Sequence, residues 1–400
     1  METRKYAPTG EAISLLGFGC LRLPLLPDGG SGSIDMAATK NMVRIAMSGG
    51  VNYYDTSYIY HQGKSENAIG EALREYPRRS FNLATKMPTF IITSREKAED
   101  IFADQLKKCQ VDYFDSYLLH SLNEEIFANC ERLGLYEMLM QKKAAGKIRR
   151  LGFSFHGRPD TLEWILDSHR WDFAQIQLNY VSWYYSTTRT EYELLAQYDV
   201  PVVVMQPLRG GHMASLGPKA AKMLQEADPQ TSAAYWGFRF AATKPRVLTV
   251  LSGMSTPEQV EDNLRIFSSF RPLSAQEEAL LQKAAGAQRT NSEVPCTDCR
   301  ACMPCPQNVN IPHLIDAYNY YKKSGMNFDF EFSCARLPTE ELARHCTACG
   351  QCVPLCPQGI DIPGKMADCA ELEKVIPGRL LIADFQWQEI KVSNPQQRRS

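Results

Sequence analysis

Several features that mark other protein classes are missing from this sequence of 400 residues. No apolar run approaches the roughly 18 residues that a membrane helix needs, and the polar stretch from Met1 to Gly10 lacks the apolar core of a secretory signal. The 44 basic and 45 acidic residues give a net charge of −1, so no basic excess points to nucleic acid. We therefore expect a cytoplasmic protein that binds neither membranes nor nucleic acid.

Glycine motifs for phosphate binding are also missing. No G-x-G-x-x-G sequence follows a predicted strand, and no P-loop occurs. The pattern of short apolar runs followed by amphipathic segments nevertheless predicts parallel βαβ units. The eight predicted strands are Leu16–Leu23, Val51–Thr56, Phe81–Met87, Phe114–His120, Leu151–Phe155, Phe173–Leu178, Val202–Gln206 and Val247–Leu251. Eight such units favour an α/β fold built as a (β/α)8 TIM barrel, with a doubly wound open sheet as the alternative.

Most of the 13 cysteines lie near the end of the chain, in two short runs that each end before a proline. The first run is Cys296, Cys299, Cys302 and Cys305, and the second is Cys346, Cys349, Cys352 and Cys356. Three cysteines at C-x2-C-x2-C spacing wrap one 4Fe-4S cluster, and the cysteine before the proline reaches the other cluster. Two such clusters are predicted, with Cys356 completing the first set and Cys305 the second.

Structural zinc and disulfides are the alternatives for these cysteines. A structural zinc site is complete with four ligands, usually supplied as two separate pairs. A third cysteine at the same spacing, followed by Cys-Pro, is therefore not expected for zinc. Disulfides are disfavoured because nothing marks the chain as secreted. The second run matches the bacterial two-cluster pattern, whereas the first is one residue short before Cys305, which leaves the crossed role of Cys305 less well supported.

Composition divides the chain into three parts. Residues 1–285 are predicted to form the barrel, and Gly286 to Pro295 form a polar linker. Residues 286–376 are predicted to form a small, mostly helical, ferredoxin-like dicluster domain, with helices at Ile311–Tyr321 and Pro338–His345 between the ligand runs. Residues 377–400 form a C-terminal tail.

Polar side chains end three successive predicted strands. Asp55 lies near the end of the second strand and Tyr60 follows it, Lys86 lies on the third, and His120 ends the fourth. Each has an ordinary structural explanation, such as a helix cap for Asp55 or a satisfied core position for His120. Because the carboxyl ends of the strands of a barrel meet at one mouth, we expect the four side chains to converge there.

These residues carry a resemblance to a known family. The segment Val51–Glu66, the sequence LATK ending at Lys86, YLLH ending at His120, GFS ending at Ser154, and the segment Pro257–Leu264 resemble the aldo-keto reductase family. The resemblance covers roughly Leu15 to Phe270. The cysteine-rich part is similar to a bacterial and archaeal subgroup in which the barrel is fused to two clusters.

The resemblance implies an NAD(P)H-dependent oxidoreductase that interconverts a small-molecule carbonyl and its alcohol. Tyr60 would donate the proton, although an unperturbed phenol near pKa 10 is a reluctant acid at neutral pH. Lys86 would lower the pKa of Tyr60, Asp55 would pair with Lys86, and His120 would orient the carbonyl.

The resemblance also implies a nicotinamide site. Ser154 and Gln175 would hold the carboxamide, and the loops after the seventh and eighth strands would hold the pyrophosphate and adenosine. The implied contacts in and beyond these loops are Gln206, Leu208, Gly210, Gly253, Ser255, Gln259 and Asn263. Gly253 and Gln259 carry no charge for a 2′-phosphate, and Arg209 is the nearby cation. NADP, NAD and a flavin all remain open as cofactors.

Two classes of function follow. The first is a carbonyl oxidoreductase that exchanges single electrons through its clusters with a redox partner such as a ferredoxin. The alternative is an electron-transfer or redox-sensing iron–sulfur protein in which the barrel is a scaffold. The four residues at the strand ends favour the first. Nothing in the sequence identifies a group that joins hydride transfer to single-electron transfer.

Overall fold

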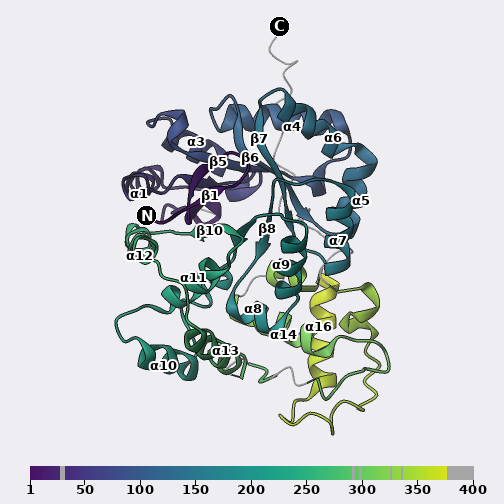
Figure 1. The fold of residues 1–400 in the computed structure, drawn as a ribbon. Coiled ribbons are helices and arrows are strands. Elements are labelled where there is room, and N and C mark those ends of the chain that lie inside the picture. Colours follow the sequence, from purple (N-terminus) through teal and green to yellow (C-terminus); the bar gives the residue numbers. More distant parts are fainter. Residues whose placement is uncertain (28–31, 291–292, 297–299, 325–326, 335–336, 376–400) are drawn as a thin grey trace.

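The computed structural model describes the chain except for residues 28–31, 291–292, 297–299, 325–326, 335–336 and 376–400. A barrel of strands ringed by helices occupies the first part of the chain, and a smaller group of helices lies beside it (Figure 1). Eight strands close the barrel in the order β10-β3-β4-β5-β6-β7-β8-β9, and every neighbouring pair is parallel. The prediction of a TIM barrel followed by a helical dicluster region is confirmed, and the open sheet is wrong.

Each barrel strand lies within or close to a predicted run. The strands are β3 (Leu16–Gly19), β4 (Tyr53–Asp55), β5 (Asn82–Met87), β6 (Phe114–Leu122), β7 (Ile148–Phe155), β8 (Phe173–Gln177), β9 (Val202–Met205) and β10 (Val247–Gly253). The first strand is shorter than predicted, because the chain turns into the 3-10 helix η1 (Cys20–Arg22) after Gly19.

Several helices around the barrel begin after a residue whose side chain caps the first turn. Side-chain oxygens of Asp35, Ser94, Asn123, Asn179 and Thr256 accept hydrogen bonds from the backbone of the first turn. The helices are α1 (Met36–Ser48), α2 (Tyr60–Gly63), α3 (Ser65–Leu73), α4 (Arg95–Lys108), α5 (Glu124–Leu133), α6 (Leu135–Ala144), α7 (Pro159–Ser168), α8 (Tyr180–Tyr185), α9 (Thr188–Gln197), α10 (Pro218–Ala227), α11 (Ala233–Thr243), α12 (Pro257–Ser268) and α13 (Ala275–Thr290).

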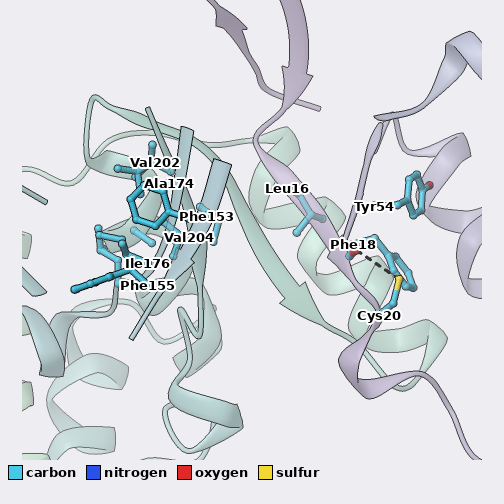
Figure 2. Close-up of a cluster of buried hydrophobic side chains, with 14 of the residues drawn as sticks. Leu16, Phe18, Cys20, Tyr54, Phe153, Phe155, Ala174, Ile176, Val202 and Val204 are labelled. Carbon is cyan, nitrogen blue, oxygen red and sulfur yellow. Dashed lines mark hydrogen bonds between the residues drawn. The ribbon is translucent and has the colours of Figure 1, made fainter. Parts of the chain in front are cut away.

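Alternate residues of each strand face opposite sides of the barrel wall. Leu16 and Phe18 belong with the outer layer that packs against the helices, as do Val202 and Val204 (Figure 2). Val203 belongs to a separate interior cluster that also contains Tyr53, Ala84, Leu118 and Phe173. Since side chains alternate with period two, Asp55, Lys86, His120 and Gln175 share the inward face with this cluster. The strand register therefore directs the candidate catalytic side chains into the barrel.

An antiparallel hairpin that the sequence did not predict lies against the barrel. Its strands are β1 (Thr3–Tyr6) and β2 (Glu11–Ser14), and it contributes Tyr6 and Ile13 to the interior cluster. Arg150, which is buried, donates a hydrogen bond of 2.8 Å from Nη1 to Glu11 Oε2. Both hairpin strands are short and mixed in polarity, so the sequence gives little strand signal there.

The second unit has its own apolar core. Val309, Leu314 and Met366 pack in it, with Phe330 and Cys369. Its helices are α14 (Ile311–Ser324), α15 (Asn327–Cys334) and α16 (Ile362–Val375). The first predicted helix is present as α14, but the predicted helix at Pro338–His345 consists of two 3-10 turns, because the extended backbone of Leu342 interrupts it.

The predicted divisions of the chain stay predictions. Helix α13 continues to Thr290, four residues past the predicted start of the linker at Gly286. The predicted tail 377–400 lies outside the described residues. Among the described residues no helix is long and apolar enough to cross a membrane.

A buried carboxyl group lies between α3 and the barrel wall. Glu66 Oε1 accepts hydrogen bonds from Thr85 Oγ1 at 2.6 Å and from Gln105 Nε2 at 2.7 Å. Gln105 Nε2 also lies 2.9 Å from the backbone oxygen of Lys86, so the network supports the strand that carries this lysine. Burial raises the pKa of Glu66 to about 7, although the two hydrogen bonds act against the shift.

This pKa makes folding stability depend on pH. Because the folded state binds a proton more tightly than the unfolded state, the free energy of unfolding falls as pH rises from about 4.5 to about 7. We expect Glu66→Gln to remove this loss and to raise the free energy of unfolding by about 2–3 kcal/mol at pH 8, with little effect at pH 4.5. Urea unfolding of the variant and the unaltered protein at both pH values measures the two free energies of unfolding. Glu71→Gln, on the exposed face of the same helix, is the control and should have little effect at either pH.

Candidate functional site

Four polar side chains meet at the carboxyl end of the barrel strands. Lys86 Nζ lies 2.6 Å from Asp55 Oδ1 and donates a second hydrogen bond of 2.7 Å to the backbone oxygen of Thr56. The same Nζ lies 4.9 Å from the ring centre of Tyr60, which begins α2 directly beyond β4. The rings of Tyr60 and His120 approach edge to face, with centres 6.1 Å apart. The structure thus brings together all four residues that the sequence singled out.

Burial and the attraction between neighbouring charges compete in setting the pKa values of this group. Burial lowers the pKa of Lys86, but the Asp55 carboxylate and the Tyr60 phenol outweigh it, and the net pKa lies above the usual value. Burial also raises the pKa of Asp55, against the attraction of Lys86. The pKa of Tyr60 is likewise raised by burial, and Lys86 lowers it only in part. Lys86 therefore acts in the expected direction, but the net fall in the pKa of Tyr60 expected from the sequence does not occur.

His120 is held in its neutral form. Burial lowers its pKa well below the usual value, and the nearby charge of Lys86 adds to the shift. Its Nδ1 lies 3.2 Å from Ser57 Oγ, and its ring packs against Phe90 with centres 5.8 Å apart. Neither Ser57 nor Phe90 was singled out from the sequence, although both follow the ends of strands.

The two residues expected to hold a carboxamide lie on adjacent strands, β7 and β8. Ser154 pairs with Gln175 in the register, and both are buried. Ser154 Oγ accepts a hydrogen bond of 2.7 Å from the backbone of Ser121. Among the described residues, Gln175 Oε1 has no hydrogen-bond partner. A buried amide oxygen of this kind fits the NH2 group of a bound carboxamide.

The loop after β9 carries the next three expected contacts. Gln206 has φ +51° and accepts a hydrogen bond of 2.8 Å from Gln177 Nε2. Leu208 lies just before a 3-10 turn, and its side chain closely approaches Gly237 of α11. Gly210 has φ +67°, a conformation that favours glycine.

The remaining expected contacts lie in and after the end of β10. Ser255 Oγ donates a hydrogen bond of 2.8 Å to the backbone oxygen of Arg22, and its backbone NH donates one of 2.7 Å to Gln259 Oε1. Asn263 Nδ2 donates to Ser252 Oγ at 2.9 Å. Gly253 is exposed beside these residues.

Arg22 lies between the two loops and was missed in the sequence. A Cβ added to Gly253 would meet the Arg22 stem at 3.3 Å, and one added to Gly210 would meet Arg22 Nη2 at 3.3 Å. Arg22 ends the 3-10 helix η1 that follows β3, so the rule that strand ends gather at one mouth was the signal that could have found it. Arg209 is therefore not the only cation at these loops.

The chain's second unit contacts the loop after β9. Arg209 Nη2 lies 2.8 Å from Asp316 Oδ2, and its guanidinium packs 4.9 Å from the ring centre of Tyr320, both on α14. His212 also packs edge to face on Tyr320, with centres 5.0 Å apart. The positive charge of Arg209 is thus partly neutralised by the carboxylate of Asp316, which belongs to the cysteine-rich part.

The cysteines surround two small cavities in the cysteine-rich part. The larger, of about 60 Å³, is lined by Cys305, Cys346, Cys349 and Cys352, with Cys302 also at its wall. The smaller, of about 20 Å³, is lined by Cys296, Cys302 and Cys356. Cys299 lies outside the described residues. Apart from Cys302, which lines both cavities, the described cysteines divide between them as in the two predicted ligand sets, which stay a prediction.

Electrostatic contacts support this grouping. Burial raises the pKa of Cys352, and the neighbouring Cys346, Cys349 and Cys305 raise it further. Within the described part of the chain, no three His, Cys, Asp or Glu side chains converge closely enough to hold a single metal ion. The thiols line the two cavities instead. A set of ligands that consists of thiols alone fits an iron–sulfur cluster.

Each of the two parts of the chain matches a known protein family. The model of the aldo/keto reductase family matches residues 16–285. The chain belongs to the aldo/keto reductase family. A 4Fe-4S dicluster domain also matches, over residues 295–360, so this aldo/keto reductase carries the cysteine-rich part as a second recognised domain.

Individual aldo/keto reductases resemble the barrel only distantly in sequence. L-galactose dehydrogenase of Arabidopsis thaliana is 26% identical over 313 residues, which cover 71% of this chain and 94% of that protein. The holo form of the aldo-keto reductase AKR11C1 from Bacillus halodurans superposes with a TM-score of 0.60 at 25% identity, over 72% of this chain and 97% of that one. An aldo-keto reductase from Klebsiella pneumoniae in complex with NADPH has the same fold, with a TM-score of 0.56 at 20% identity over 71% and 95% of the two chains.

The position of Arg22 gives a test of the two-loop site. We expect Arg22→Met, which keeps much of the stem but removes the charge, to weaken binding of NADH and NADPH alike by about 10- to 100-fold, the usual value of one charge-assisted contact. Fluorescence titration of the reduced nucleotides measures it. Arg132→Met, exposed on α5, is the control. A loss confined to NADPH would place Arg22 at the 2′-phosphate instead of the pyrophosphate.

Proposed function

We propose that this aldo/keto reductase interconverts a small-molecule carbonyl and its alcohol with a nicotinamide cofactor, and that it exchanges single electrons through two 4Fe-4S clusters. The observation that carries the proposal is the convergence of Asp55, Tyr60, Lys86 and His120 on the inward face of three adjacent strands and the turn after β4. Reduction of a carbonyl requires a proton donor, and it is helped by a cation that lowers the pKa of this donor and by a neutral imidazole that binds the carbonyl oxygen.

Tyr60 is the proton donor in this proposal. Because burial keeps its pKa above the usual value, the phenol holds its proton at neutral pH and can give it to the developing alkoxide. Lys86 lies close to the Tyr60 ring and stabilises the phenolate that remains. Asp55 fixes the ammonium group through the contact of 2.6 Å.

His120 orients the carbonyl. Its Nδ1 is turned to Ser57, which directs Nε2 to the other side of the ring. A neutral imidazole can donate a hydrogen bond from this nitrogen without adding a second positive charge beside Lys86.

The nicotinamide supplies the hydride when it is bound. Ser154 and Gln175 would hold its carboxamide, and this is supported by Gln175 Oε1, which has no hydrogen-bond partner in the part of the chain that the structure describes. The loops around Gly210 and Gly253 would hold the pyrophosphate together with Arg22, and Gln259 and Asn263 lie on the helix beyond for the adenosine. The NADPH complex of the Klebsiella protein agrees with NADP, while the uncharged Gly253 and Gln259 keep NAD as the alternative.

The cysteines would hold the clusters in two crossed sets. Cys305 joins Cys346, Cys349 and Cys352, and the remaining set is Cys296, Cys299, Cys302 and Cys356. We place the junction of the two domains near residue 286 and propose a cytoplasmic enzyme that meets a redox partner such as a ferredoxin.

Removal of the phenolic oxygen tests the barrel chemistry. We expect Tyr60→Phe to reduce kcat for carbonyl reduction by about 10²- to 10⁴-fold, because a positioned general acid contributes that much. Binding of the nicotinamide, measured by fluorescence, should change little. Tyr198→Phe removes the hydroxyl of an exposed tyrosine that contacts Asp167, and it should retain full activity. Full turnover by Tyr60→Phe on every substrate that the unaltered protein reduces would show that the barrel is a scaffold.

Metal analysis tests the cysteine sets. Anaerobically purified protein should contain about eight iron and eight sulfide per chain, the content of two cubanes. Cys352→Ser should lower both by about half and destabilise the cysteine-rich domain first, because metal binding there contributes to folding. Cys130→Ala, in the barrel, should keep the full content. Stoichiometric zinc without sulfide would overturn the assignment.

A further inference from the structure

Three segments from distant parts of the chain meet beside Gly210. A Cβ added to this glycine would lie 3.1 Å from the hydroxyl of Tyr320 and 3.3 Å from Arg22 Nη2. Arg22 ends η1, Gly210 lies in the 3-10 turn η4 (Arg209–Gly211) after β9, and Tyr320 lies on α14 of the dicluster domain. A residue of the second domain therefore reaches the loop that is expected to hold the pyrophosphate.

The glycines of this loop permit the close approach. Gly210 has φ +67° and Gly211 has φ +98°, a region that residues with a side chain rarely adopt. A side chain at position 210 would also press on the Tyr320 hydroxyl and on the Arg22 guanidinium. The backbone of the loop is thus bare where these two polar groups come nearest to it.

Several contacts hold the ring of Tyr320 in this position. Tyr320 is buried, the guanidinium of Arg209 lies 4.9 Å from its ring centre, and the ring of His212 meets it edge to face at 5.0 Å. Asp316, one turn earlier on the same face of α14, binds Arg209 at 2.8 Å. Together these contacts direct the Tyr320 hydroxyl to Gly210.

The charges around Gly210 favour an anion. The carboxylate of Asp316 neutralises Arg209, so the positive charge beside Gly210 comes from Arg22. Three further carboxylates line a cavity of about 870 Å³ between α8 and α14, to which neither Arg22 nor Gly210 contributes: Asp160, Glu340 and Glu341. Arg22 and the Tyr320 hydroxyl are both hydrogen-bond donors, and two donors with one positive charge beside a bare backbone suit a phosphate group.

We propose that the hydroxyl of Tyr320 donates a hydrogen bond to the pyrophosphate of the bound nicotinamide cofactor, an inference that rests on the proposed function. The dicluster domain then supplies one residue to the nucleotide site, opposite Arg22 of the barrel. Tyr320 lies outside residues 16–285, which match the aldo/keto reductase family, so the family match does not account for this contact.

Removal of the single hydroxyl tests the proposal in the full-length protein, purified anaerobically with its clusters. Fluorescence titration measures the affinity for NADH and NADPH, and calorimetric titration measures the affinity for ADP-ribose, which keeps the pyrophosphate but lacks the nicotinamide. We expect Tyr320→Phe to weaken binding of all three by about tenfold, the lower end for a hydrogen bond to a charged group.

Tyr318→Phe is the matched control. Tyr318 is also buried on α14, but its hydroxyl donates a hydrogen bond of 3.3 Å to Asp368 on α16, within the dicluster domain. This variant should keep the affinity of the unaltered protein for all three ligands. Because Tyr320→Phe keeps the ring that packs on Arg209 and His212, its iron content and its urea unfolding curve should match those of the unaltered protein.

The outcomes separate this inference from the proposed function. Equal affinities in Tyr320→Phe and Tyr318→Phe would overturn the inference alone. A weaker affinity that comes with lost iron or a lower urea midpoint would also overturn it, because the hydroxyl would then act through the docking of the domain. A loss for NADH and NADPH but not for ADP-ribose would place the hydroxyl away from the pyrophosphate and overturn it too. If Tyr320→Phe weakens binding of ADP-ribose but the unaltered protein reduces no carbonyl, the inference stands and the carbonyl activity falls.

Discussion

The contact between Lys86 and Asp55 is the constraint on which the site depends. Removing two charges from water costs several kcal/mol for each, and the cost is offset only when the geometry is good and the remaining hydrogen bonds are made. The barrel provides this geometry, because neighbouring strands β4 and β5 direct both side chains inward and the carbonyl of Thr56 accepts a further bond. Without Asp55 the ammonium group would be buried and uncompensated. Tyr60 and His120 would then lose the charge that influences both of them.

Burial and charge act in opposite directions on Tyr60, and burial is the larger effect. The general rule that a nearby ammonium lowers the pKa of a phenol holds for the contribution of Lys86 alone. The net shift is upward because the charged form of the phenol loses solvation among the side chains of the barrel mouth. The reduction direction benefits from this balance, since a protonated phenol is the form that donates.

Much of the fold was predictable from local patterns. The strand positions follow from short apolar runs, and the inward placement of Lys86 and His120 follows from the period of two within each strand. The cysteine groups follow from spacing alone. The hairpin Thr3–Ser14 was missed because its strands are weakly apolar. Arg22 was missed because its importance comes from two loops more than 180 residues away in the chain, which only the closed barrel brings near it.

The ion pair between Arg209 and Asp316 places one side chain in two sites at once. Arg209 belongs to the loop that faces the expected pyrophosphate, and its partner belongs to a helix of the dicluster domain. Binding equilibria that share such a group are linked, and the linkage is reciprocal. If binding of the nucleotide changes the free energy of docking of α14, docking of α14 changes the free energy of nucleotide binding by the same amount. Under the proposed assignment of the pyrophosphate to this loop, the dicluster domain helps to form the nucleotide site, and the affinity of the barrel for its cofactor depends on the whole chain.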